Sequence, residues 1–168
     1  MPTLHLVRHG VALDRGAWPG SDQSRPLTEF GWRQSLAISC VLAEQAVQLF
    51  CSSPTVRCCD TLMPAAHSRG LEVTPLSLLF ESNEPQSPEE AVGLLQRIVS
   101  TCLAGGVEVA AAATHGNILL PLLTHAPGGG QQRCPKGGVW RLELSPRLDP
   151  LHVEFQGYLN PKTGEWAR

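Results

Sequence analysis

The sequence has no long apolar run, no block of like charge and few aromatic residues. Thirteen Lys and Arg stand against 15 Asp and Glu, for a formal net charge of -2, and the basic residues are scattered. Scattered basic charge gives no footprint for a nucleic-acid backbone or an anionic membrane surface, so we expect neither partner. The apolar stretches fall far short of the roughly 20 residues that span a bilayer. The N-terminus also lacks a basic segment followed by an apolar run, so we expect a soluble, cytoplasmic protein.

Cysteine pairs at zinc-ligand spacing are also missing. The six cysteines form no CxxC motif, which predicts free thiols in a reducing compartment and no metal or other cofactor. Hydrophobic residues make up 42% of the chain and charged residues 17%, a balance that excludes a disordered protein. The 168 residues suit one domain over 1–168 with a sizeable core. Nothing in the sequence indicates an oligomeric state.

Short apolar runs alternate with helical periodicity along the chain. We expect helices from Thr28 to Ala46, after Ser53-Pro54, from Ser87-Pro88 to Leu103 and over 118–123, with the serines and the threonine as N-caps. We expect strands over 4–7, 47–51, 72–75 (an edge strand), 107–113, 139–144 and 151–158, the last two antiparallel. Loops are expected over 11–27, 77–86 and 127–138. The alternation predicts an α/β protein, a three-layer α/β/α sandwich with a mostly parallel central sheet.

Polar side chains follow three of the predicted strands. Arg8 and His9 follow the first, Arg57 follows the second, and His115 follows the alanine-rich strand. Ligands of open α/β sheets bind at the carboxyl ends of the strands, so we expect these residues to meet there. Arginine forks suit the charge on a transferred phosphoryl group, and a neutral histidine provides a lone pair in line with it. Gly10 and Gly116 permit the close approach of backbone N–H groups to an anion.

The motifs around these residues resemble those of the histidine phosphatase superfamily, which has the phosphoglycerate-mutase-like fold. They occur in family order over nearly the whole chain, and four ordered motifs are far more specific than an RHG triplet alone. They are Leu6-Val7-Arg8-His9-Gly10, Leu27-Thr28-Glu29 with Gly31 and Gln34, Ser52-Ser53-Pro54 with Arg57 and Thr61, and Thr114-His115-Gly116.

This resemblance implies a metal-independent phosphatase in which His9 becomes transiently phosphorylated and water later releases phosphate. The phosphoryl group would be bound by Arg8, Arg57 and His115, with Gly116 beside them. Many family members place the general acid in the loop after the third strand, where Glu81 is the candidate and Glu84 the substitute.

The chain is similar to two small branches of the family, the bacterial phosphohistidine phosphatases and the phosphatase domains fused to Nudix hydrolases. The second likeness includes Trp18-Pro19-Gly20, Arg57-Cys58 with Thr61-Leu62, and Lys136-Gly137 before Trp140. Imidazole is a better leaving group than an alkoxide, so a phosphohistidine substrate needs less help from an acid. The substrate class, a small phosphorylated metabolite or a phosphohistidine protein, stays open at this point.

Three other functions compete with this interpretation. A catalytically silent phospho-ligand binder would keep the anion site without turnover. A phosphoglycerate mutase is disfavoured because the chain lacks the insertions of the mutase members. A cysteine-dependent phosphatase would use the Cys-x5-Arg spacing from Cys51 to Arg57, but Pro54 removes one N–H from that loop.

The remaining candidates have weaker support from their surroundings. Three basic loop residues either contact substrate or carry surface charge: Arg15, Arg25 and Lys136. We expect Trp18 and Trp140 either to line a pocket for a base or ring or to pack in the core. Four histidines lie outside any motif and receive no role: His5, His67, His125 and His152.

Overall fold

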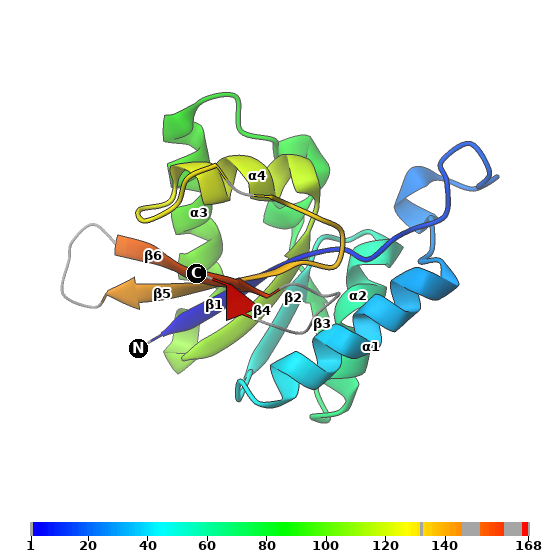
Figure 1. The fold of residues 1–168 in the computed structure, drawn as a ribbon, viewed down its shortest axis with the longest axis horizontal. Coiled ribbons are helices and arrows are strands. Elements are labelled where there is room, and N and C mark those ends of the chain that lie inside the picture. The colour runs from blue at the N-terminus through cyan, green and yellow to red at the C-terminus, as the bar shows by residue number, and fades with distance from the viewer. Residues whose placement is uncertain (1, 132, 146–151, 160–165, 168) are drawn as a thin grey trace.

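The computed structural model describes residues 2–131, 133–145, 152–159 and 166–167. Its strands form one sheet in the order β3-β2-β4-β1-β5-β6-β7 (Figure 1). The first four of these strands run parallel to one another, and the last three pair antiparallel. Their bounds are β1 Thr3–Arg8, β2 Leu49–Ser52, β3 Val73–Pro75, β4 Val109–Thr114, β5 Val139–Ser145, β6 His152–Leu159 and β7 Trp166–Ala167.

Helices cover both faces of the sheet, α1 and α2 on one and α3 and α4 on the other (Figure 1). The alanine run of β4 lies at the centre, and its alternate residues serve the two layers. Ala111 and Ala113 pack in the cluster with α1 and α2, whereas Ala110 and Ala112 pack in the cluster with α3 and α4. The structure therefore confirms the predicted three-layer fold. The helices are α1 Glu29–Ala43, α2 Val56–His67, α3 Pro88–Cys102 and α4 Gly116–His125.

Two of the three predicted helix caps are confirmed. The Thr28 hydroxyl accepts from the Gly31 N–H at the start of α1, and the Ser87 hydroxyl accepts from the Glu90 N–H at the start of α3. The cap predicted at Ser53 is wrong, because α2 begins at Val56 with Thr55 at the N-cap. The Ser53 hydroxyl instead lies 2.8 Å from Nε2 of His115, so it serves the neighbouring strand end rather than the helix.

The other differences lie at element ends. The first helix ends at Ala43 rather than Ala46, because Ala46 has a φ of 52° that no helix continues. The last helix, expected to begin with 118–123, begins two residues earlier at Gly116 and ends at His125. The predicted loop 77–86 contains two short 3-10 turns, and β7 was not predicted. Residue 151 of the last predicted strand lies outside the described residues. Within the part described, no helix combines the length and apolarity needed to cross a membrane.

Candidate active site

Three neighbouring parallel strands, β2, β4 and β1, bring the predicted site residues to one edge of the sheet. The His9 N–H donates to the Thr114 carbonyl at 3.1 Å, and the Ser53 N–H donates to the Ala113 carbonyl at 2.9 Å. These bonds continue the strand pairing just past the strand ends, where the side chains turn toward one another. The rings of His9 and His115 are consequently 5.4 Å apart between centroids, at an interplanar angle of 65°.

His9 is buried and held in one tautomer. Its Nδ1 lies 2.7 Å from the Gly10 carbonyl, an acceptor, so Nδ1 carries the proton and Nε2 keeps its lone pair. Burial lowers the pKa of His9 to about 3, against the Gly10 hydrogen bond that raises it, and His115 and the arginines lower it further. The Gly10 N–H in turn donates to the Thr61 hydroxyl at 2.9 Å. The ring is therefore neutral, and its hydrogen bond fixes its orientation.

His115 faces the same space from the end of β4. Its Nδ1 lies 3.4 Å from Nη2 of Arg57, a donor, so Nδ1 accepts that hydrogen bond. Nε2 therefore carries the proton and donates a hydrogen bond to the Ser53 hydroxyl. Burial first, and the Arg57 charge second, lower the pKa of His115 to about 4. Both imidazoles of the site are thus neutral at pH 7 in the free protein.

The two arginines are placed beside the histidines with donors to spare. Arg57 is 1% exposed and donates to the Asp22 carbonyl at 2.7 Å, the Asp22 carboxylate at 3.1 Å and the Glu81 carboxylate at 3.3 Å. Arg8 donates through Nη1 to the Cys134 carbonyl. The Nε atoms of both arginines are buried and have no hydrogen-bond partner among the described residues. Buried donors of this kind are normally paired, which makes these two candidates for binding an anion.

Gly116 is required by the position of Arg8. A Cβ at residue 116 would lie 2.8 Å from Cζ of Arg8 and 2.9 Å from its Nε and Nη2. Since these distances are shorter than non-bonded atoms tolerate, only glycine lets the guanidinium pack against the first residue of α4. The guanidinium therefore lies at the N-terminus of a helix, a place that favours anions.

The two candidate acids differ in what they contact. The Glu81 carboxylate lies 3.3 Å from Nη2 of Arg57 and 3.6 Å from Nδ1 of His115, and its side chain is 32% exposed. The Glu84 carboxylate instead accepts from the Asn117 amide at 3.0 Å, and that amide also donates to the Glu81 carbonyl at 2.9 Å. The structure thus brings Glu81 to Arg57 and His115 and places Glu84 against Asn117 instead.

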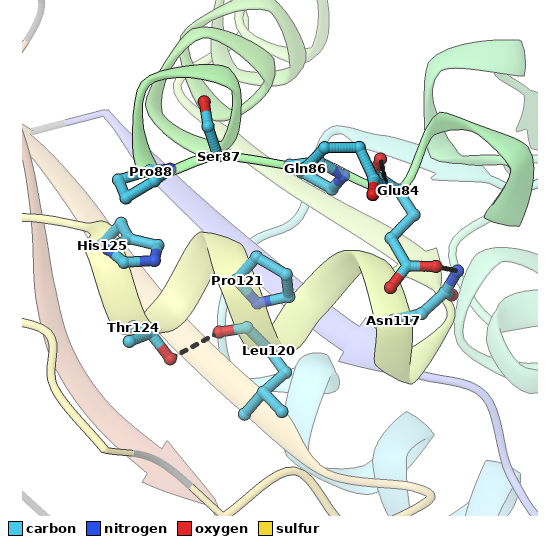
Figure 2. A pocket seen from close by; sticks show the side chains of 10 residues that line it. Glu84, Gln86, Ser87, Pro88, Asn117, Leu120, Pro121, Thr124 and His125 are labelled. Atoms are coloured by element: carbon cyan, nitrogen blue, oxygen red, sulfur yellow. Dashed lines mark hydrogen bonds between the residues drawn. The ribbon is translucent and has the colours of Figure 1, made fainter.

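A groove begins at Asn117 and follows α4 away from the site (Figure 2). The segment from Glu84 to Pro88 forms one wall and α4 forms the other, around a volume of about 320 Å³. Leu120, 44% exposed, lies on the α4 wall, and His125 lies at the far end. The lining of the groove mixes prolines with amide, hydroxyl and imidazole groups, so the groove suits a partly polar ligand.

The loop residues have structural partners. Arg15 and Arg25 each donate through Nε to the Asp22 carboxylate, at 3.0 and 2.9 Å. Lys136 contributes its carbonyl, which accepts from the Gln34 amide at 2.9 Å. Trp140 is completely buried in the core, whereas Trp18 donates to Ser21 and Ser24 on the surface loop.

Cys51 and Arg57 do not form a cysteine phosphatase site. Cys51 lies in the core cluster on the α3 and α4 side of the sheet, whereas Arg57 belongs to α2 on the opposite face. Cys58 is near His115, with Sγ 3.7 Å from Nε2, but burial raises the pKa of this thiol to about 12, so it is not a thiolate. No group of three or more His, Cys, Asp or Glu side chains that could hold a metal ion occurs in the described ranges.

Asp22, Ser53 and Asn117 are site neighbours that sequence reasoning missed. Asp22 lies in a loop with no periodic pattern, 35 positions from the arginine that it contacts. Ser53 stands before a proline, which is typical of a helix cap. Asn117 follows the His115-Gly116 pair directly, and that adjacency was the one signal that could have singled it out.

Comparison with known proteins agrees with this architecture. The family model of the histidine phosphatase superfamily (branch 1) matches residues 4–86. The protein histidine phosphatase SixA complexed with tungstate is 23% identical, with a TM-score of 0.71 over 95% of this chain and 97% of that one. YhfR of Bacillus stearothermophilus is 19% identical, with a TM-score of 0.67 over 95% and 98%.

A third similar structure is that of a phosphatase named for a phosphorylated sugar acid. The mycobacterial glucosyl-3-phosphoglycerate phosphatase in complex with inorganic phosphate is 15% identical, with a TM-score of 0.68 over 93% of this chain and 96% of that one. At such identities the structural likeness shows the fold. Since the family model matches residues 4–86, the part of the chain that carries His9 and Arg57, the protein belongs to the histidine phosphatase superfamily.

Proposed function

We propose that the protein is a phosphatase that hydrolyses a phosphomonoester or a phosphohistidine through a phosphohistidine intermediate on His9. One observation carries the proposal: a neutral imidazole with a free Nε2 lies beside buried Arg57 and half-buried Arg8, whose buried Nε–H groups have no partner among the described residues. Donors fixed around the transferred group and a nucleophile in line with it are what phosphoryl transfer requires.

In the first step, Nε2 of His9 attacks phosphorus and the bond from phosphorus to the leaving group breaks. Glu81, in its neutral form, gives its proton to the leaving atom. Arg8 and Arg57 bind the equatorial oxygens. A bound dianion also favours the protonated form of His115, whose Nδ1–H then donates to a phosphoryl oxygen.

In the second step, the Glu81 carboxylate takes a proton from water. The water oxygen bonds to phosphorus, and the bond from Nε2 to phosphorus breaks. Phosphate leaves, His9 is neutral again, and Glu81 holds the proton for the next cycle. The Gly10 carbonyl accepts a hydrogen bond from Nδ1–H of His9, which keeps Nδ1 protonated throughout, so Nε2 stays the reacting atom.

The test is the acid-labile phosphoenzyme. We expect His9→Ala to abolish both the turnover of para-nitrophenyl phosphate and the formation of the acid-labile phosphoenzyme. His67→Ala, a change at an exposed histidine on α2, is the matched control and should keep both. Full activity in His9→Ala would refute the mechanism. Phosphate binding without turnover in the unmodified protein, from mildly acidic to mildly basic pH, would favour the silent binder.

A further inference from the structure

Asp22 is the centre of an arginine cluster at the mouth of the site. Its Oδ1 accepts from Nε of Arg15 at 3.0 Å and from Nε of Arg25 at 2.9 Å. Its Oδ2 accepts from Nη2 of Arg57 at 3.1 Å, and its backbone carbonyl accepts from Nη1 of the same arginine at 2.7 Å. Asp22 therefore holds both terminal nitrogens of the buried guanidinium from a loop that lies outside the sheet.

Asp22 and Glu81 share one atom, Nη2 of Arg57, but their surroundings differ. Asp22 has three arginine partners, whereas Glu81 has Arg57 and the neutral His115. Although burial favours the neutral acid, Arg57 and Arg25 lower the pKa of Asp22 to about 2. When two carboxyl groups lie beside one ligand, the proton goes to the group with fewer positively charged neighbours.

A bound phosphoryl group makes this difference functional. Its negative charge adds to those of the two carboxylates on Arg57, and the repulsion is relieved when one carboxyl takes up a proton. Because Arg15, Arg25 and Arg57 together stabilise the charge of Asp22, Glu81 is the group that becomes the neutral acid.

We propose that Asp22 is a positioning residue, a permanent counter-ion that orients the Arg57 guanidinium and directs the proton of the site to Glu81. The inference rests on the proposed phosphatase function. Asp22 touches Arg57 and not the reacting atoms, so its effect must appear through the orientation of Arg57 and the protonation of Glu81.

The experiment compares Asp22→Asn with Asp14→Asn, both measured by the pH dependence of kcat on para-nitrophenyl phosphate. Asp14 lies in the same loop, and its carboxylate accepts from the Gly16 N–H. We expect Asp22→Asn to lower kcat about tenfold, because Arg57 loses a partner that orients it. The alkaline limb of the profile should move roughly one unit toward lower pH, because Glu81 loses a like-charged neighbour and no longer shares the Arg57 charge with it. Asp14→Asn should leave both unchanged.

A further variant separates charge from shape. Asp22→Glu keeps the negative charge, so its alkaline limb should stay in place even if kcat falls. A profile of Asp22→Asn that matches Asp14→Asn would overturn the inference, and so would a loss of kcat with an unshifted limb. The unmodified protein is first assayed for the acid-labile phosphoenzyme. If that species is absent the proposed function fails, whereas if it is present the Asp22 variants alone decide the inference.

Discussion

The two sides of the site are built in opposite ways. On the phosphoryl side, His9, Arg57 and His115 are 7%, 1% and 3% exposed, and each has hydrogen-bond partners: the Gly10 carbonyl, Asp22 with Glu81, and the Ser53 hydroxyl. On the leaving-group side, the Glu81 side chain is 32% exposed and lies on a 3-10 turn. Leu120 is 44% exposed and lines an open groove (Figure 2). The first side is buried where paired strands end and α2 begins, whereas the second consists of loop and helix surface.

This contrast separates the chemistry from the choice of substrate. In the proposed function, the buried side would bind only what all phosphoryl compounds share, namely oxygens around phosphorus. The open side would meet the part of the substrate that varies, and its loop can change without disturbing the sheet. Mutations on the two sides should therefore differ in whether their effect depends on the substrate.

The largest effect that should depend on substrate is expected at Glu81. Glu81→Gln keeps the size of the side chain and removes the proton, so we expect kcat to fall about a hundredfold for an alkyl phosphate, whose leaving group needs an acid. For a phosphohistidine peptide the fall should be less than about fivefold, because imidazole leaves without strong assistance. Steady-state kinetics on the two substrates measures the ratio.

Glu84→Gln is the matched control, since its carboxylate accepts from Asn117 rather than contacting the arginines. It should change kcat for either substrate by less than about threefold, because it removes no proton from the site. Equal losses in the two glutamine variants would place the acid elsewhere.

A smaller loss, independent of the substrate, is expected at Gly116. The Cβ of Gly116→Ala would displace the Arg8 guanidinium, which lies 2.8 Å away, so kcat/KM should fall about tenfold for both substrates. Gly93→Ala is the control, because a Cβ at that position of α3 meets nothing within 4 Å. It should keep full activity and stabilise the protein by about 0.5–1 kcal/mol. A substrate-dependent loss in Gly116→Ala would contradict the division of the site into two sides.

The same contrast explains how much could be predicted. Alternating apolar residues and the Thr28 and Ser87 caps predicted the layers, because strand and helix periodicity reflect burial directly. The four ordered motifs predicted the phosphoryl side, because parallel strands must end at a common edge. Ser53 was misread because a serine before proline looks the same whether it caps a helix or binds His115.

The leaving-group side was harder to predict, for physical reasons. Asp22 contacts Arg57 of α2 and Asn117 of α4 contacts Glu81, so each contact joins a helix to a segment distant in sequence, and no periodicity records such contacts. Glu81 could be selected over Glu84 only by the family pattern, since both lie in one polar loop. The structure separates them by placing one on Arg57 and the other on Asn117.

The smallest predicted effect concerns stability rather than turnover. His9 is neutral in the folded state with a pKa lowered to about 3 by burial, whereas the unfolded chain has the ordinary value of 6.5. The unfolded state therefore takes up a proton first as the pH falls. The stability contributed by the neutral ring is present above pH 6.5 and is lost progressively down to about pH 3, by about 1.4 kcal/mol per pH unit at most.

His9→Gln, whose side chain cannot be protonated, should remove this part of the pH dependence. Urea unfolding at pH 7 and pH 5 measures it: the free energy of unfolding of His9→Gln should fall less between the two pH values than that of the unmodified protein. His67→Gln, a change at an exposed side chain, is the matched control and should follow the unmodified protein. Parallel curves for all three proteins would mean that the phosphoryl side does not hold its nucleophile in the neutral form, and the rigid half of the comparison would lose its electrostatic basis.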